Sequence, residues 1–374
     1  MRMLMLTRGE RIAPSSRLRS YQFVPWFEEA GVEVTPAPLL TGRYITGLYQ
    51  GRRPELLSVC GRYVARVQRM LSARRYDVLW VEQEALPWMP AWCDEALFKW
   101  AAIPFIVDYD DAVYQRYRDV RGWYVPLVTH NKIDRLMRRA DVVIAGNAEI
   151  ALYAAAAGAL RVKIVPTAVD PRRYDAGELA ADGLFRVCWV GTPITAKFLE
   201  IVRGPLTEFC RGSGARLTVI GAPQWKSDDI DVEHVAWSEE SEAASIARCD
   251  MGIMPLYDGA FERGKCGYKL LQYMACRRPV IASPVGVNRR LVKEGVNGFL
   301  AAGAADWLAA MRKLYGSAEL RRKMGHAGRE LVEKEYSVQT VGPRLANIVK
   351  TARQNWCSSH GTQALRGNAY ENVD

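Results

Sequence analysis

Two lysines within residues 263–275 stand in a setting that is typical of a phosphate-binding turn. Lys265 lies between Gly264 and Gly267, and Lys269 follows four residues later in an apolar helix. The glycines let the backbone run close to a ligand and direct N–H groups toward it, and the helix adds its positive N-terminal dipole. A diphosphate carries about two negative charges, so a second lysine would complete the neutralisation that the first begins. The alternative is that both are solvated lysines of an ordinary loop.

A second turn of the same kind follows the apolar residues 185–190. Gly191 ends this strand, Pro193 suits the first turn of a helix, and Lys197 lies within reach of the turn. Ligands of open parallel sheets bind outside the carboxyl ends of the strands. We therefore expect Lys197 and Lys269 to approach one polyanion from two loops.

The elements that must position these turns form two similar halves. Strand-like runs alternate with helical stretches in both, which is typical of parallel α/β domains. The runs are residues 3–6, 32–35, 78–81, 105–108, 142–145 and 162–165 in the first half, and 185–190, 217–220, 232–235, 252–254 and 280–282 in the second. At 374 residues, the chain is long enough for two domains that each bury a core.

The domain boundaries follow from composition and periodicity. We expect a first domain at residues 1–168, a polar, proline-bearing linker at 169–184 and a second domain at 185–337. The helical pattern at 338–355 predicts a helix that crosses back to the first domain. Residues 356–374 have no core-forming pattern and are expected to be disordered.

Composition excludes several classes of protein. Eight scattered cysteines without a close pair argue against a disulfide framework, and with only four histidines they also argue against a metal site. No apolar run approaches the roughly 20 residues that span a bilayer, and charge comes too early for a signal peptide. We expect a cytoplasmic protein that needs neither metal nor cofactor.

The net charge of +10 is compatible with nucleic acid, an anionic membrane or an anionic substrate. Nucleic acid is not expected, because the chain lacks a binding motif or an aromatic-basic platform. Two amphipathic helices carry basic residues that could rest on anionic lipid or simply keep the protein solvated. These residues are Arg62, Arg66 and Arg69 in the first helix, and Lys132, Arg135, Arg138 and Arg139 in the second.

Candidate ligand-binding residues also follow strands of the first half. Ser16 and Arg17 lie in the first turn, and Asp110 and Asp111 end the strand at 105–108. The acidic pair is interpreted as an acceptor-binding or helix-capping element, and Arg17 as a partner of an anionic ligand or a surface arginine. The aromatic residues Trp88, Trp92, Trp123 and Tyr124 could stack on a sugar or lipid, or fill the core.

The second half resembles the C-terminal domain of glycosyltransferase family 4, which has the GT-B fold. The resemblance lies in residues 191–197, 252–286 and 294–300, and it extends to 15–17, 108–112, 145–147 and 166–170 in the first half. It implies two Rossmann-like domains whose parallel sheets face across a cleft. The first would bind the acceptor, and the second would bind a nucleotide-sugar donor.

The resemblance also assigns roles to individual residues. It implies that Lys197 meets the donor diphosphate, that the Gly267 backbone contacts phosphate, and that Gln272 stands in place of a ribose-binding glutamate. The chain departs from the family at two positions, with Gly264 where the first glutamate usually stands and Thr192 where an arginine follows Gly191. Candidates to replace the missing groups are Glu262, Arg263, Lys265 and Lys269.

Together these residues predict an enzyme. Lysines at both turns suit a reaction in which a leaving diphosphate gains charge, and the resemblance implies retention of anomeric configuration without a histidine base. The predicted function is transfer of a hexose from a nucleotide-diphosphate sugar to a sugar or lipid-linked acceptor of a cell-surface polysaccharide or glycolipid. The enzyme would lie in the cytoplasm or on the inner face of the plasma membrane. The alternatives are a sugar-nucleotide 2-epimerase of the same fold and an inactive nucleotide-sugar binding protein.

Overall fold

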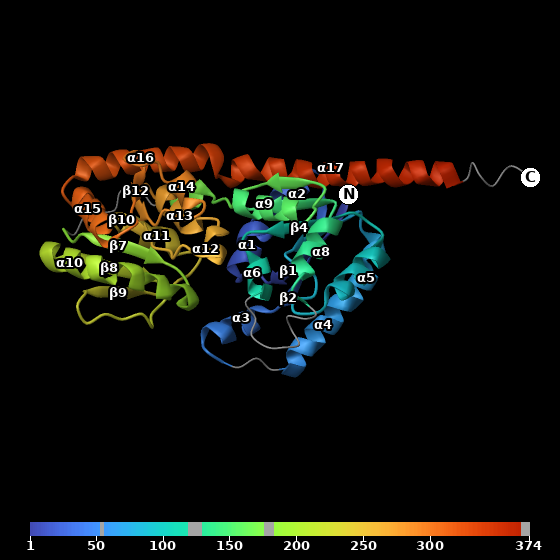
Figure 1. The fold of residues 1–374 in the computed structure, drawn as a ribbon, viewed down its shortest axis with the longest axis horizontal. Helices are drawn as coiled ribbons and strands as arrows, with labels where there is room; N and C mark the ends of the chain where they lie inside the picture. Colours follow the sequence, from blue (N-terminus) through green and yellow to red (C-terminus); the bar gives the residue numbers. More distant parts are fainter. Residues whose placement is uncertain (53–55, 119–128, 176–182, 368–374) are drawn as a thin grey trace, which may run out of the picture. The chain divides into compact units, whose positions relative to one another are not determined.

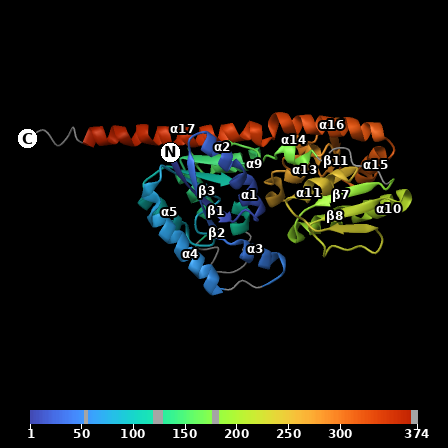
Figure 2. The ribbon, with the colours of Figure 1, turned by 180° about the vertical axis from the view of Figure 1, so that it is seen from behind.

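Two six-stranded sheets, one in each half of the chain, organise this computed structural model (Figures 1 and 2). The structure describes residues 1–52, 56–118, 129–175 and 183–367. Every pairing between the described strands of the two sheets is parallel, as the alternating pattern predicted. The chain divides into two units: unit 1 comprises residues 1–166 and 341–374, and unit 2 comprises residues 167–340.

Unit 1 has the strand order β2-β1-β3-β4-β5-β6. The change of direction between β1 and β3 is where ligands of such sheets usually bind. The strands are β1 Arg2–Gly9, β2 Glu33–Leu40, β3 Val78–Glu82, β4 Phe105–Tyr109, β5 Val142–Ala145 and β6 Val162–Ile164. Most strands are buried on both faces, because helices cover both sides of a parallel sheet.

Helices of unit 1 connect successive strands. They are α1 Pro14–Arg19, η1 Tyr21–Phe23, α2 Val24–Glu29, α3 Gly42–Tyr49, α4 Leu56–Leu71, η2 Ala73–Arg75, α5 Ala91–Ala101, α6 Val113–Arg118, α8 Lys132–Arg139 and α9 Ala148–Ala156. Helices α4, α5 and α8 contact one another in that order. On α1, the buried Arg19 donates from Nε and Nη2 to both oxygens of Asp108, over 2.9 and 2.6 Å, which fixes this helix against the end of β4.

Two cations that were expected on basic helix faces are buried instead. Arg66 of α4 is 3% exposed and donates to the carbonyl oxygens of Thr7 and Ala37 over 2.6 and 2.9 Å. Lys132 of α8 is fully buried, with Nζ 2.8 Å from Glu84 Oε2 and 3.0 Å from Asp94 Oδ2. The sequence showed their helical spacing but not the carbonyls and carboxylates that face them.

Unit 2 has the strand order β12-β11-β10-β7-β8-β9. The strands are β7 Arg186–Val190, β8 Arg216–Ile220, β9 Val232–Val235, β10 Met251–Met254, β11 Val280–Ala282 and β12 Gly298–Leu300. The first five match the expected runs, and β12 adds an edge strand. The helices are η3 Pro171–Tyr174, η4 Pro193–Val202, α10 Arg203–Ser213, α11 Glu242–Ala247, α12 Ala260–Arg263, α13 Tyr268–Ala275, α14 Asn288–Leu291, α15 Ala304–Tyr315 and α16 Ala318–Glu335.

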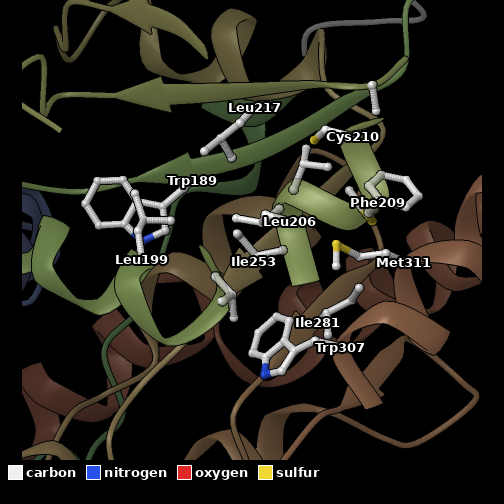
Figure 3. Close-up of a cluster of buried hydrophobic side chains, with 14 of the residues drawn as sticks. Trp189, Leu199, Leu206, Phe209, Cys210, Leu217, Ile253, Ile281, Trp307 and Met311 are labelled. Atoms are coloured by element: carbon white, nitrogen blue, oxygen red, sulfur yellow. The ribbon is translucent and has the colours of Figure 1, made fainter. Parts of the chain in front are cut away.

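Apolar clusters cover both faces of the second sheet. One includes Trp189 and Ile253 from the strands, Leu206 from α10 and Met311 from α15 (Figure 3). The other includes buried residues of α13, which contacts α16 and β10. This burial holds the start of α13 against the sheet, where the candidate lysines lie.

The expected linker is wrong over its first residues. Val169 forms a bridge with Ser337, and Tyr174 is 2% exposed within an apolar cluster of unit 2. These two apolar side chains anchor a segment whose polar composition suggested a linker. Residues 176–182 lie outside the described part of the chain.

The last helix, α17, covers Val338–Gly367, and its residues from Val341 onward belong to unit 1. Gly342 packs against the ring of Trp26, and Arg344 donates to the carbonyl of Ile164 over 3.4 Å. The prediction of disorder from residue 356 is wrong as far as Gly367, because α17 continues to that residue. Residues 368–374 lie outside the described residues. No described helix, α17 included, has the length and apolar character needed to cross a membrane.

Candidate active site

The turn after β7 is closed by its own polar groups. Thr195 Oγ1 accepts from the Thr192 N–H over 3.1 Å and donates to the Thr192 carbonyl over 3.0 Å. A Cβ atom at Gly191 would lie 2.6 Å from Lys269 Nζ and 2.7 Å from Thr195 Oγ1. Glycine is therefore needed at position 191 for the lysine and the threonine to come this close.

Lys269 reaches this turn from α13. The helix starts after Gly267, whose φ of +67° lies in the left-handed region that favours glycine. Lys269 Nζ lies 4.0 Å from the ring centroid of Trp189 and 3.5 Å from Thr195 Oγ1, to which it donates. Two segments more than seventy residues apart in sequence thus meet at one ammonium group.

The surroundings of Lys269 disfavour its charged form. Part of the side chain meets solvent, but burial lowers the pKa of Lys269 to about 7, and the positive charge of Lys265 adds to this effect. Neither Lys269 nor Lys197 forms an ion pair with any described carboxylate. An anion that enters beside Lys269 would supply the missing opposite charge.

Lys265 and Lys197 lie against a common aromatic ring. Lys197 Nζ is 5.3 Å and Lys265 Nζ 5.9 Å from the ring centroid of the buried Phe198. Lys265 also lies 4.7 Å from the Phe261 ring and is close enough to Lys269 to lower its pKa. We call Lys197, Lys265 and Lys269 the lysine cluster; the structure brings all three together around the Gly191 turn.

Other predicted donor residues lie in the same segment, and two of them have partners within unit 2. Arg263 Nε donates to Asp258 Oδ1 over 2.7 Å, so this arginine already has a carboxylate partner. Glu262 is partly exposed in the short helix α12, and Gly264 is buried after it. Gln272 is 2% exposed and its Nε2 donates to the Tyr174 hydroxyl over 3.3 Å. Its amide is therefore engaged inside unit 2, and contact with a ribose stays a prediction.

In unit 1, the predicted acceptor residues gather at the carboxyl ends of β1, β3 and β4. The buried Ser16 donates to Glu82 Oε2 over 2.7 Å and accepts from the Gly9 N–H over 3.0 Å. Gln83 accepts from Arg8 over 3.0 Å and donates to Asp110 Oδ1 over 3.1 Å.

The two remaining acceptor candidates stand beside this network. Arg17 is 5% exposed in α1, which excludes its interpretation as a surface arginine. Asp111 precedes α6, and its Oδ2 lies 3.6 Å from Nη2 of Arg116 in that helix. Both predicted pairs, Ser16 with Arg17 and Asp110 with Asp111, thus lie at the same edge of the first sheet.

Glu82 and Gln83 were missed from the sequence. Glu82 is 1% exposed, and burial raises its pKa to about 7 against the opposing hydrogen bonds from Ser16 and the Arg8 N–H. The backbone of Gln83 has a φ of +63°, which is uncommon for a residue other than glycine. The signal was the Glu82-Gln83-Glu84 run directly after a buried strand, at the edge where ligands of parallel sheets bind.

Comparison with known proteins shows what these halves are related to. Residues 3–169 match a family model described as a glycosyl transferase 4-like domain, and residues 195–317 match a model described as glycosyl transferases group 1. Both halves are glycosyltransferase domains. All three lysines of the cluster lie in the group 1 match, and Ser16, Glu82 and Asp110 lie in the 4-like match.

Solved structures share the fold over most of this chain. Anabaena HepE, solved in complex with UDP-glucose, aligns with a TM-score of 0.70 and 15% identity over 94% of this chain and 100% of its own. WaaG, a glycosyltransferase involved in lipopolysaccharide biosynthesis, aligns with a TM-score of 0.67 and 13% identity over 93% and 99%. The two glycosyltransferase domains therefore have the GT-B fold that was predicted.

Curated relatives match over a shorter region. The D-inositol 3-phosphate glycosyltransferase of Arthrobacter sp. (strain FB24) is 32% identical over 102 residues, and that of Paenarthrobacter aurescens (strain TC1) is 34% identical over 87. The first match spans 27% of this chain and 23% of the relative, and the second spans 22% and 20%.

Proposed function

We propose that this GT-B glycosyltransferase moves a hexose from a nucleotide-diphosphate sugar to a sugar or lipid-linked acceptor, with retention of anomeric configuration. The observation that carries the proposal is the lysine cluster. It gathers three cations around a glycine turn, and two of them form no ion pair among the described residues. HepE, which has the same fold, was solved with UDP-glucose, so a UDP-sugar is the first donor to test.

The cluster would act on the leaving group. As the sugar separates from the diphosphate, negative charge grows on the phosphate oxygens, and cations held in place beforehand stabilise that charge without reorganising. Lys269 would meet the diphosphate at the Gly191 turn, while Lys197 and Lys265 would neutralise it from the side of Phe198. Lys269 would thereby supply the cation near the turn that an arginine after Gly191 supplies in the family that the sequence resembles, since this chain has Thr192 at that position.

The acceptor would bind at the network of unit 1. Carboxylates such as Asp110 accept hydrogen bonds from sugar hydroxyls, and Arg17 could pair with a phosphate on a lipid-linked acceptor. A phosphate oxygen of the donor would receive the acceptor proton, so the proposal needs no histidine base. It also includes no metal, which activity in the presence of EDTA would support and loss of activity on chelation would contradict.

A turnover assay tests the proposal and its alternatives together. The full chain is incubated with UDP-hexoses, with and without a panel of sugar and polyprenyl-phosphate-linked acceptors. The products are separated by chromatography and assigned by NMR, because anomers and epimers have the same mass. Transfer that requires an acceptor and yields the donor's anomeric configuration supports the proposal. Epimerised nucleotide sugar without acceptor would identify a 2-epimerase, and donor binding with neither product would identify an inactive binding protein.

A further inference from the structure

Helix α4 carries a row of exposed apolar side chains. Leu57, Val64 and Leu71 are 89%, 57% and 51% exposed. They are spaced seven residues apart, so they lie along one face of the helix. Isolated exposed leucines need no explanation, but a row of three on a helix whose opposite face is packed on the sheet indicates a contact surface.

Helix α5, which packs against α4, exposes tryptophans. Trp92 and Trp100 are 63% and 45% exposed, and Trp88 and Met89, just before the helix, are 45% and 40% exposed. Trp92 and Trp100 are eight residues apart and therefore share one helix face.

Hydrogen bonds hold the two helices together along this face. Trp100 Nε1 donates to the Leu71 carbonyl over 3.1 Å, and the Tyr63 hydroxyl donates to the Pro87 carbonyl over 2.7 Å. Figures 1 and 2 both show α4 and α5 side by side. We call the exposed side of these helices, with Leu57, Val64, Leu71, Trp88, Trp92 and Trp100, the α4–α5 face.

The charge around the face has one sign. Between residues 57 and 101, every charged side chain that is exposed is basic, whereas the acidic ones are buried or only partly exposed. Asp77 lies 3.7 Å from Arg353, and Glu95 pairs with Arg135 and Arg139. The exposed cations are Arg62, Arg69, Arg74, Arg75 and Lys99.

We propose that the α4–α5 face binds the surface of an anionic lipid bilayer, with its tryptophans and leucines in the interface and its arginines on the headgroups. Tryptophan favours the membrane interface because its ring is apolar and its N–H is polar. Clustered cations add attraction to anionic lipid. The same positive charge disfavours a second copy of this chain as the occupant, because two such faces would repel.

This surface keeps Arg62 and Arg69 of the first basic helix that the sequence suggested, but it excludes Arg66 and Lys132, which are buried, and it adds the tryptophans of α5. It also goes beyond the proposed function, because it does not depend on the lysine cluster of unit 2. An experiment can therefore contradict the membrane proposal without contradicting the proposed donor site, and the reverse.

Flotation of the full chain with vesicles tests the proposal. One set contains phosphatidylcholine and phosphatidylglycerol, and the other contains phosphatidylcholine alone. The test variant is Leu57→Ser with Trp92→Ser, two side chains for which no hydrogen bond or ring contact occurs among the described residues. The matched control is Leu152→Ser with Leu160→Ser, which are 69% and 82% exposed elsewhere in unit 1. Circular dichroism and nucleotide-sugar affinity show whether each variant is folded.

We expect the wild type and the control to float with the anionic vesicles and to release as salt rises. The Leu57/Trp92 variant should bind at least about tenfold more weakly, since two side chains that enter the interface are lost. Replacing Arg62 and Arg69 by alanine should weaken binding by about 30-fold. No binding to anionic vesicles at low salt would overturn the proposal. So would equal binding by the Leu57/Trp92 variant, or a lipid-free dimer that this variant abolishes.

Discussion

Donor binding should take up a proton at Lys269. Burial and the charge of Lys265 lower the pKa of Lys269 to about 7 in the free protein, from an ordinary value of 10.5. A diphosphate beside Nζ favours the charged form and should raise this pKa again. The free enzyme therefore holds fewer protons than the complex at pH values above about 7, and the nucleotide sugar must bind together with a proton.

The size of the effect follows from the difference between the pKa of Lys269 in the free protein and its pKa in the complex. If Lys269 is fully protonated in the complex, the donor affinity scales with the protonated fraction of the free lysine. That fraction is about three quarters at pH 6.5 and about 3% at pH 8.5, so the affinity should fall about 25-fold over this interval. About half a proton should be taken up per donor bound at pH 7.

Isothermal titration calorimetry measures both quantities. Titrations of a UDP-sugar at several pH values, in two buffers with different protonation enthalpies, give the affinity and the number of protons taken up. Lys269→Arg keeps its charge at every pH, so its affinity should be nearly constant between pH 6.5 and 8.5. Lys197→Ala should bind more weakly but keep the pH dependence. Tight wild-type binding with no proton uptake at pH 7 would refute the reasoning.

Three further changes test the surroundings of the two candidate sites. Gly191→Ala should cost about 1–3 kcal/mol of donor binding or stability, because its Cβ would crowd Lys269 and Thr195; calorimetry and thermal melts measure this, and wild-type values would contradict the close approach. Asp108→Ala should lower the free energy of unfolding by about 3–5 kcal/mol in urea, because it leaves Arg19 buried without its partner; a loss below about 1 kcal/mol would contradict a buried ion pair. Because the folded pKa of Glu82 is raised to about 7, the wild type should lose stability as pH rises from about 4.5 to 7, and Glu82→Gln should lack this loss; equal pH profiles would contradict the buried carboxyl.

The sheets and the two loops that carry Lys197 and Lys269 could be predicted from the sequence because their signals are local. Apolar runs alternate with helical stretches, and residues 191–197 and 264–269 each combine glycines with a lysine next to a helix. The carboxyl ends of parallel strands lie at one edge, so even the meeting of the two loops followed from the pattern. The structure adds the side-chain contacts at which the loops meet, those of Lys269 with Trp189 and Thr195.

What could not be predicted depends on contacts between distant segments. Arg66 looks like a member of a basic stripe until the carbonyls of Thr7 and Ala37 are known to face it. Tyr174 looks like part of a linker until its hydroxyl is seen beside Gln272. Glu82 has an ordinary sequence position, and only its burial beside Ser16 marks it as a group with an unusual pKa. In each case the partner is a group far away in sequence.

The central claim is that Lys197 and Lys269 hold the diphosphate of one nucleotide sugar. The most direct measurement is the calorimetric affinity of a UDP-sugar for the wild type, for Lys197→Ala with Lys269→Ala, and for the exposed control Lys323→Ala. Each lost charge-assisted hydrogen bond is worth about 1.5–3 kcal/mol, so the double variant should bind more than about 100-fold more weakly, and the control should bind like the wild type. A folded double variant with wild-type affinity would contradict the claim.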